Sequence, residues 1–335
     1  MELEARFHKK IFKFKRPSGT SRGVLTQKHS WYIELWDSND PDIVGIGECS
    51  IIPGLSPDFV DSASYEAKIE SVCNNLKQDI NDWPSIKFGI ETALLDLKNG
   101  GKSIIYDNDF SRSQKGIAIN GLVWMGDEEF MKEQIQEKIE LGFKTIKMKI
   151  GALDFNKEYG ILNSIRKIYS ADEITIRVDA NGAFSAKDAL NKLTLLSELE
   201  IHSIEQPIMA GQTNSMRKLC QQTPLPIALD EELIGINNVA DKMELLDTIT
   251  PQFIVIKPSL HGGISGSREW IELAEKKNIK WWMTSALESN VGLNAICQLT
   301  AEFNNELPQG LGTGSLYTEN ISSNLAVKNG SIYYE

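Results

Sequence analysis

Three things are scarce or missing in this 335-residue chain, and each excludes a class of protein. No apolar run approaches the roughly 18 residues of a membrane-spanning helix, so we expect no membrane contact. Basic residues are outnumbered, and the formal net charge of −11 disfavours nucleic acid as a partner. The four cysteines lie far apart without a Cys-x-x-Cys pair, which is typical of reduced thiols. We therefore predict a soluble cytoplasmic protein of unknown oligomeric state.

Residues 1–115 predict an α+β domain. Apolar and polar residues alternate over the first 50 positions, as at Leu3, Ala5 and Phe7, which is typical of half-buried strands. Residues 62–100 have helical spacing and end at a Gly-Gly pair. Lysines and arginines between positions 6 and 16 interleave with two phenylalanines, and we interpret them as the solvated face of a strand.

Residues 116–314 follow another pattern, in which short apolar strands alternate with amphipathic helices as in parallel βαβ units. Eight strands are predicted, at 117–124, 145–150, 174–180, 202–206, 227–231, 253–258, 280–285 and 310–312. Eight such steps favour a closed barrel, and the lack of a Gly-x-Gly-x-x-Gly turn after any strand argues against an open dinucleotide-binding sheet. Residues 315–335 are predicted to be irregular structure and a strand that return to the first domain.

Charged residues stand at the carboxyl ends of consecutive predicted strands, where the reacting groups of such barrels lie. These charged positions are Lys147, Lys149, Arg177, Asp179, Glu205, Asp230, Glu231 and Lys257. Steps of 30, 26, 25 and 27 residues separate positions 149, 179, 205, 230 and 257, so each occupies the equivalent place on its strand. Burying an unpaired ion costs on the order of several kcal/mol of folding free energy, so these charges must pair with one another or bind an ion.

Three carboxylates from neighbouring strands would form an all-oxygen site, which suits Mg²⁺ or Mn²⁺ and not Zn²⁺. The candidate ligands are Asp179, Glu205 and either Asp230 or Glu231. The last choice stays open because neighbours on a strand face opposite ways. Two flanking lysines, Lys149 and Lys257, can act as bases if they are partly desolvated near a cation. The pattern therefore predicts metal-assisted proton abstraction next to the carboxylate of a small molecule, and the regular spacing argues against scattered ion pairs.

Five segments, in order along the chain, resemble the muconate-lactonizing-enzyme subgroup of the enolase superfamily. They are 145–151 (TIKMKIG), 177–181 (RVDAN), 203–207 (SIEQP), 229–231 (LDE) and 256–258 (IKP). The resemblance implies a modified (β/α)7β barrel with an α+β capping domain, and Mg²⁺ as the cofactor, with Mn²⁺ as a possible substitute. It further implies metal ligands and acid/base lysines, and it favours Asp230 over its neighbour. The implied residues are the ligands Asp179, Glu205 and Asp230 and the lysines Lys149 and Lys257.

Within that subgroup the chain is most similar to the o-succinylbenzoate synthase family, the dehydratases of menaquinone synthesis. The stretches 285–293 (SALESNVGL) and 310–314 (GLGTG) carry this narrower resemblance. Dipeptide epimerases of the subgroup use an Asp-x-Asp on the eighth strand to hold the substrate ammonium, and this chain has Gly312-Thr313-Gly314 there. N-Succinylamino acid racemases are the main alternative, since some family members catalyse both reactions. A non-catalytic barrel scaffold is the least favoured alternative.

The implied reaction is a syn elimination of water from a succinyl-hydroxycyclohexadiene carboxylate through an enediolate. In this mechanism Lys149 removes the α-proton and then protonates the departing hydroxide. Lys257, as an ammonium, stabilises the anion from the opposite face. Lys147 is expected beside the substrate carboxylate, and Arg177 is expected to orient a ligand carboxylate.

Weaker signals concern the rest of the substrate site. Thr284, Ser285 and the backbone of Gly310 are predicted to hydrogen-bond the substrate at the seventh and eighth strands. In the first domain, the turn-rich stretches 19–22 and 52–55 either close over the site or are ordinary turns.

Overall fold

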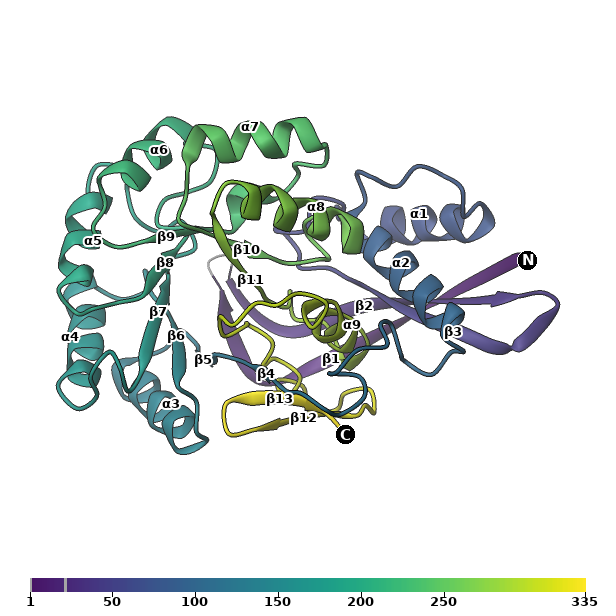
Figure 1. Ribbon diagram of the computed structural model, residues 1–335, viewed down its shortest axis with the longest axis horizontal. Coiled ribbons are helices and arrows are strands. Elements are labelled where there is room, and N and C mark those ends of the chain that lie inside the picture. The colour runs from purple at the N-terminus through teal and green to yellow at the C-terminus, as the bar shows by residue number, and fades with distance from the viewer. Residues whose placement is uncertain (1, 21–22) are drawn as a thin grey trace.

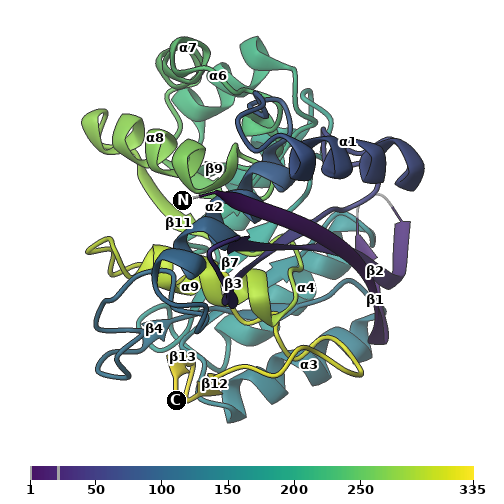
Figure 2. The same cartoon turned by 90° about the vertical axis from the view of Figure 1, so that its right-hand side faces the viewer.

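The structure is a computed structural model that describes residues 2–20 and 23–335. A twisted antiparallel sheet with two helices lies beside a ring of parallel strands wrapped by helices (Figure 1). From the side, β1 and β2 cross in front of that ring (Figure 2). In the described part of the chain no helix is long and apolar enough to cross a membrane.

The first domain, here called the cap, is a three-stranded antiparallel sheet with two helices. Its elements are β1 (Leu3–Thr20), β2 (Gly23–Asp37), β3 (Asp40–Ser50), α1 (Ser62–Asn74) and α2 (Pro84–Lys98). The predicted alternation is confirmed, since Trp31, Ile33 and Leu35 are all buried in one apolar cluster with residues of both helices. The lysines and arginines between positions 6 and 16 are exposed, as expected of a solvated strand face.

The opposite face of this sheet packs against the barrel. Phe12, Phe14 and Tyr32 join one buried cluster with Leu260 and Leu287 of the barrel domain. The sheet is therefore apolar on one face toward its own helices and on the other toward the barrel, and the second contact places the cap over the ends of the barrel strands.

The barrel strands form a parallel sheet in the order β11-β10-β9-β8-β7-β6-β5. They are β5 (Gly121–Val123), β6 (Thr145–Lys149), β7 (Thr175–Asp179), β8 (Ser203–Glu205), β9 (Ile227–Leu229), β10 (Phe253–Ile256) and β11 (Lys280–Met283). The helices around them are α3 (Glu128–Glu140), α4 (Phe155–Arg166), α5 (Ala189–Ser197), α6 (Thr213–Gln222), α7 (Val239–Ile249), α8 (Gly263–Lys276) and α9 (Asn290–Thr300). Strand residues that face the helices make up the main apolar core.

The two edges of this sheet are joined by a segment of two residues, Gln309 and Gly310. Gln309 forms a parallel bridge with Ile119, and Gly310 forms one with Thr284. The N–H of Gly310 donates to Met283 O (2.7 Å), and the N–H of Gln309 donates to Ala118 O (2.8 Å). The predicted (β/α)7β barrel is thereby confirmed, although its eighth strand is shorter than expected and begins one residue earlier.

Two other strand predictions need correction. The predicted strand at 117–124 is divided into β4 (Ile117–Ala118) and β5. β4 pairs with the C-terminal hairpin of β12 (Leu325–Lys328) and β13 (Ser331–Tyr334), so it belongs to another sheet. The predicted strand at 227–231 ends at Leu229, and a 3-10 turn (Glu231–Leu233) follows.

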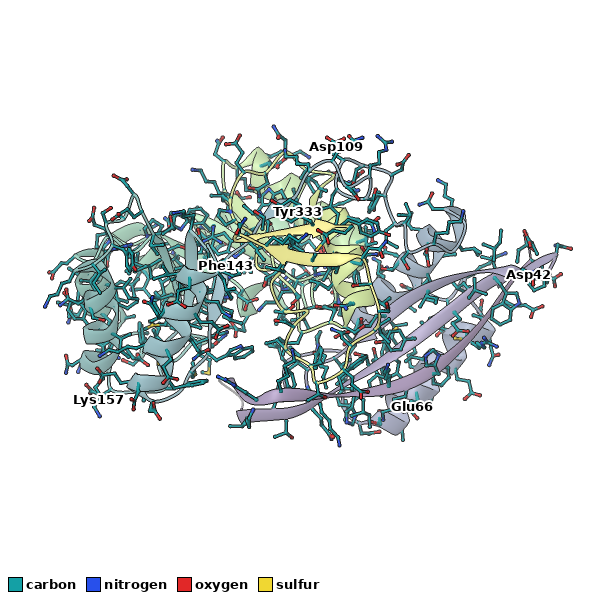
Figure 3. All side chains as sticks on the ribbon, turned by 90° about the horizontal axis from the view of Figure 1, so that it is seen from below. Asp42, Glu66, Asp109, Phe143, Lys157 and Tyr333 are labelled. Carbon is teal, nitrogen blue, oxygen red and sulfur yellow. The ribbon has the colours of Figure 1, made fainter. Side chains whose placement is uncertain are left out.

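The C-terminal hairpin lies on the underside of the molecule, where Tyr333 marks it in Figure 3. Before it, the chain passes along the cap, where the N–H of Lys15 donates to Leu316 O (2.8 Å) and the N–H of Thr318 donates to Lys13 O (2.9 Å). The domain limits at residues 115 and 314 stay predictions.

Candidate active site

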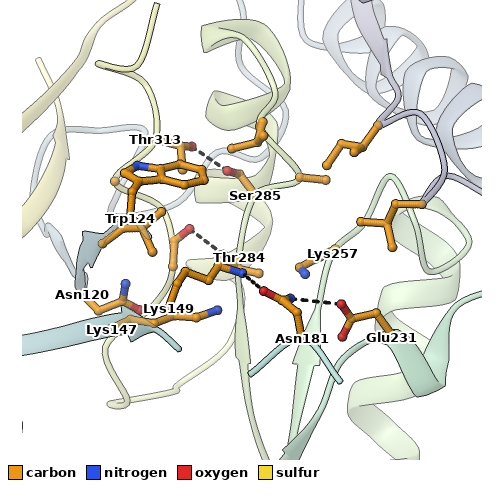
Figure 4. A pocket seen from close by; sticks show the side chains of 17 residues that line it. Asn120, Trp124, Lys147, Lys149, Asn181, Glu231, Lys257, Thr284, Ser285 and Thr313 are labelled. Atoms are coloured by element: carbon orange, nitrogen blue, oxygen red, sulfur yellow. Dashed lines mark hydrogen bonds between the residues drawn. The ribbon is translucent and has the colours of Figure 1, made fainter. Parts of the chain in front are cut away.

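A cavity of about 100 Å³ opens at the carboxyl ends of the barrel strands, beneath the cap. One side of it carries charged and amide groups: Asn120, Lys147, Lys149, Asn181, Glu231 and Lys257. The other side, here called the neutral wall, has no charged side chain: Ile52, Leu55, Trp124, Thr284, Ser285, Ala286, Leu287, Gly310, Gly312 and Thr313 (Figure 4). Leu122 also lines the cavity. Of the two predicted capping turns, 52–55 contributes to this lining, and positions 21–22 of the other lie outside the described residues.

The lysines of β6 meet the carboxylates of β7 and β8. Lys147 Nζ lies 2.5 Å from Glu205 Oε2 and 2.8 Å from Asp179 Oδ2. Lys149 Nζ lies 2.7 Å from the same Asp179 oxygen. Both lysines point inward because they are two residues apart on one strand, as the sequence predicted.

On the opposite side, Lys257 follows β10 and pairs with Asp230 Oδ2. Glu231 lines the cavity while Asp230 pairs with Lys257 of that lining, because the strand ends at Leu229 and the alternation of faces stops there. Burial raises the pKa of Asp230, and the negative charge of Asp179 adds to that effect. The charge of Asp230 in turn helps to raise the pKa of Glu205, so the three carboxylates belong to one electrostatic network.

Asn181 is a site residue to which the sequence analysis gave no role. Its Oδ1 accepts a hydrogen bond from Lys149 Nζ (2.7 Å), and its Nδ2 donates to Glu231 Oε1 (3.0 Å; Figure 4). Its own backbone N–H donates to Asp179 Oδ1 (3.0 Å). The backbone of Asn181 has a positive φ of 42°, which asparagine tolerates better than most residues. The signal was present in the RVDAN motif, two residues after the predicted ligand.

Burial and charge act against each other in this network. Burial alone would raise the pKa of Asp179, but the ammonium groups of Lys147 and Lys149 outweigh it and hold that pKa well below its usual value. Burial raises the pKa of Glu205, and the negative charge of Asp179 raises it further. Burial disfavours the charge on Lys257, yet Asp230 and Glu205 outweigh it and raise the pKa of that ammonium.

Two buried carboxylate oxygens are available for a cation. Glu205 Oε1 and Asp230 Oδ1 find no hydrogen-bond donor among the described residues. Within residues 2–20 and 23–335, no group of three acidic, histidine or cysteine side chains is arranged to hold a metal ion. At this site, lysine ammonium groups pair with the carboxylates instead. The donor set that these residues would offer is all oxygen, which fits Mg²⁺.

Comparisons with known proteins identify the family of this chain. Residues 130–334 match the family described as "Enolase C-terminal domain-like". The chain belongs to the enolase superfamily. It is 43% identical to an o-succinylbenzoate synthase of Desulfotalea psychrophila, over 98% of both chains. The crystal structure of MenC from the same organism superposes with a TM-score of 0.86 at 40% identity, covering 99% of this chain and all of that one.

A more distant relative in the superfamily has another activity. An N-succinyl-L-Arg/Lys racemase of Bacillus cereus is 25% identical over 84% of this chain and 79% of its own length.

The predicted substrate-binding residues all line the cavity, but their hydrogen bonds are partly committed. The hydroxyl of Thr284 donates to Gly310 O (2.9 Å), and the hydroxyls of Ser285 and Thr313 share a hydrogen bond of 2.5 Å. The N–H of Gly310 already donates to Met283 O, so the expected backbone donor is used for barrel closure. The hydrogen bond between Ser285 and Thr313 uses only one of their two hydroxyl protons.

Arg177 has other partners than predicted. It is 1% exposed and lies inside the barrel, where one guanidinium nitrogen donates to Pro308 O (2.7 Å). Its guanidinium carbon lies 4.0 Å from the ring centroid of Trp282. Burial lowers the pKa of Arg177 to about 10, and Glu205 opposes this only through its charge. Arg177 therefore contacts the segment that closes the barrel and is not hydrogen-bonded to a carboxylate predicted as a metal ligand.

Proposed function

We propose that this chain is an o-succinylbenzoate synthase, a magnesium-dependent lyase of menaquinone biosynthesis. It would eliminate water from a succinyl-hydroxycyclohexadiene carboxylate and release o-succinylbenzoate. The observation that carries the proposal is that Lys149 of β6 and Lys257 at the end of β10 line one cavity, each paired with a buried carboxylate. The 43% identity to a synthase with this activity, over nearly the whole of both chains, supports it.

Asp179, Glu205 and Asp230 would hold Mg²⁺ through their carboxylate oxygens. When bound, the ion would supply positive charge opposite the ring carboxylate of the substrate and so make its α-proton more acidic. Lys147 adds a second positive charge on the same side, since it contacts two of the three ligands.

Lys149 is proposed as the base. Its Nζ is held between Asp179 and Asn181, so its direction is fixed before the substrate binds. After it takes the α-proton, the same ammonium can protonate the hydroxide that leaves from that face of the ring, and aromatisation of the ring drives the step. Lys257 stays an ammonium because its facing carboxylates raise its pKa, and it stabilises the enediolate from the other face.

The neutral wall argues against dipeptides as substrates. Gly312, Thr313 and Gly314 stand where dipeptide epimerases carry two aspartates, so a substrate ammonium would be left unpaired. An unpaired buried charge costs about 3–5 kcal/mol, which is more than two decades in rate. An N-succinylamino acid hides its nitrogen in an amide, so racemisation of such compounds is the second candidate function and would be a slower side reaction.

The test is a side-by-side measurement of kcat/KM with Mg²⁺ on the dehydration substrate, N-succinylamino acids and dipeptides. We expect the dehydration substrate to be best and dipeptides to be negligible. If N-succinylamino acids are best, the chain is a racemase, and if a dipeptide is best, the role given to the neutral wall is wrong.

A further inference from the structure

A second group of buried charges lies outside the reacting network, where the cap meets the barrel. It consists of Lys28 on β2, Glu48 on β3 and Glu288 in the loop between β11 and α9. Their exposed fractions are 2%, 0% and 0%. The reaction mechanism uses none of them, so their burial calls for another explanation.

Lys28 joins one backbone carbonyl from each domain. Its Nζ donates to Ile51 O in the cap (2.5 Å) and to Ala286 O in the barrel loop (3.0 Å). Burial lowers the pKa of Lys28 to about 8, and the charges of Glu288 and Glu48 oppose that effect. The side chain therefore remains a charged donor at neutral pH, and it crosses the domain boundary.

Glu48 connects the same two domains from the next strand. Its carboxylate accepts hydrogen bonds from the N–H and hydroxyl of Ser289 (2.9 and 2.6 Å) and from the N–H of Gly292 (2.9 Å). Ser289 and Gly292 are at the N-terminus of α9, where a negative charge is favourable. A cap residue thus accepts hydrogen bonds from backbone N–H groups at the N-terminus of a barrel helix. The hydroxyl of Ser30 on β2 donates a further hydrogen bond to the Glu48 carboxylate (2.7 Å).

These contacts hold the backbone that forms the neutral wall of the cavity. Ala286 and Leu287 line the cavity from the barrel side, and Ile52, next to Ile51, lines it from the cap side. Leu287 has a positive φ of 63°, an unfavourable conformation for leucine that the surroundings must stabilise. Lys28 holds Ala286 O on one side of it, and the Tyr317 hydroxyl donates to Leu287 O (2.5 Å).

We propose that Lys28 is a positioning residue that sets the distance between the two sides of the neutral wall, and with it the fit of the non-reacting part of the substrate. Lys28 acts through Ile51–Ile52 and Ala286–Leu287, because its ammonium group donates a hydrogen bond to a backbone carbonyl of each pair without lining the cavity itself. The lysines and carboxylates of the reacting side have separate contacts. Loss of Lys28 should therefore weaken substrate binding and leave the chemical step and Mg²⁺ affinity largely unchanged. This inference rests on the proposed function, whose site it describes more closely.

The experiment compares Lys28→Met with a matched control, Lys242→Met. Lys242 is also a buried lysine (1% exposed), bonded to Gly266 O (3.3 Å) and to Glu269 Oε2 (2.6 Å) between α7 and α8. Both variants lose a buried ammonium, so loss of stability alone affects both. For Lys28→Met we expect KM to rise about tenfold or more with kcat within about threefold of the wild type. Lys242→Met should keep the wild-type KM.

Lys28→Arg, which keeps the charge and the donors, should recover most of the wild-type KM. If Lys28→Met does not fold, Lys28→Gln is judged by the same KM criterion. An unchanged KM, a loss confined to kcat, or an equal rise of KM in Lys242→Met overturns the inference. All variants are assayed on the substrate that the wild-type enzyme turns over best among the three types, so an error in the proposed function shows in the wild type alone.

Discussion

In the barrel, Asp179 is fully buried beside two ammonium groups, whereas in the cap Asp58 is buried (6% exposed) beside a serine. Asp58 Oδ2 accepts hydrogen bonds from the N–H of Ser85 (2.8 Å) and from its hydroxyl (2.6 Å). Burial raises the pKa of Asp58 to about 6, because these neutral donors oppose it only in part. The pKa of Asp179 is shifted the opposite way by its lysines.

The two aspartates show that burial alone does not decide the charge of a carboxylate. In the barrel, the ammonium groups of Lys147 and Lys149 keep Asp179 ionised despite its burial, as its proposed role in binding a cation requires. In the cap, serine and backbone donors connect a loop to the start of α2, and a fixed charge is not needed there. The same residue type is therefore kept ionised in the barrel and is shifted toward its neutral form in the cap.

The strongest test of the charged side is Lys149→Ala. We expect turnover to fall by about 10⁴-fold or more, since no proton can be taken from the substrate on that face. Exchange of the substrate α-proton with D₂O, followed by NMR, should be lost as well. Lys98→Ala, an exposed lysine at the end of α2, is the control and should behave as the wild type. Retained exchange in Lys149→Ala would mean that another residue is the base.

The next test removes one charge from the proposed metal site. Glu205→Gln should weaken Mg²⁺ binding at least about tenfold and lower activity by about two to three orders of magnitude, because three carboxylates are needed to offset the desolvation of the ion. Calorimetric Mg²⁺ titration measures the first effect. Asp58→Asn changes a buried carboxylate to its amide in the cap and should leave Mg²⁺ affinity unaltered. Full activity of the wild type in a strong chelator would contradict the metal assignment.

A smaller effect is expected where the barrel closes. A Cβ atom at Gly310 would lie 2.2 Å from Thr284 Oγ1, whereas one at Gly312 would meet its nearest atom, Ile119 Cδ1, at 3.4 Å. Gly310→Ala should therefore displace Thr284, lower stability by about 1–3 kcal/mol and lower kcat/KM, while Gly312→Ala should be tolerated. Thermal unfolding and steady-state kinetics of the pair measure both effects, and equal behaviour of the two variants would refute the steric argument.

The charged side of the site was predictable from the sequence because its residues repeat with the βα unit. Lys149 and Asp179, thirty residues apart, are brought to a contact of 2.7 Å by adjacent strands in register. The prediction of alternating faces did not hold at Glu231, since the strand ends before it. It was also insufficient for Arg177, whose partner Pro308 lies 131 residues away.

The contacts between cap and barrel could not be predicted from the sequence, because no repeating spacing relates the residues that make them. Lys28 and Ala286 are 258 positions apart, and their contact depends on how two domains pack. A lysine within a strand of mixed composition looks like a solvated residue, and only the packing of the sheet on both faces buries it. Asn181 is an intermediate case. Its RVDAN motif could be recognised in the sequence, but its hydrogen bonds to Lys149 and Glu231 could not be predicted from it.

The smallest expected effect sharpens the comparison of the two aspartates. Because folding raises the pKa of Asp58 from about 3.8 to about 6, the native protein holds a proton that the unfolded chain has lost between these values. The contribution of Asp58 to stability is therefore complete below about pH 4 and is lost as the pH rises through 6. The loss should be on the order of 3 kcal/mol.

Asp58→Asn does not titrate and keeps an acceptor for Ser85, so it should gain stability relative to the wild type as the pH rises from 4 to 7. Urea unfolding of both proteins across this range, with the difference plotted against pH, isolates Asp58, since all other carboxylates titrate alike in the two proteins and cancel. Parallel profiles would show that Asp58 is ionised in the folded protein throughout. The cap would then keep a buried carboxylate charged without a lysine, and the contrast with Asp179 would not depend on counter-charge.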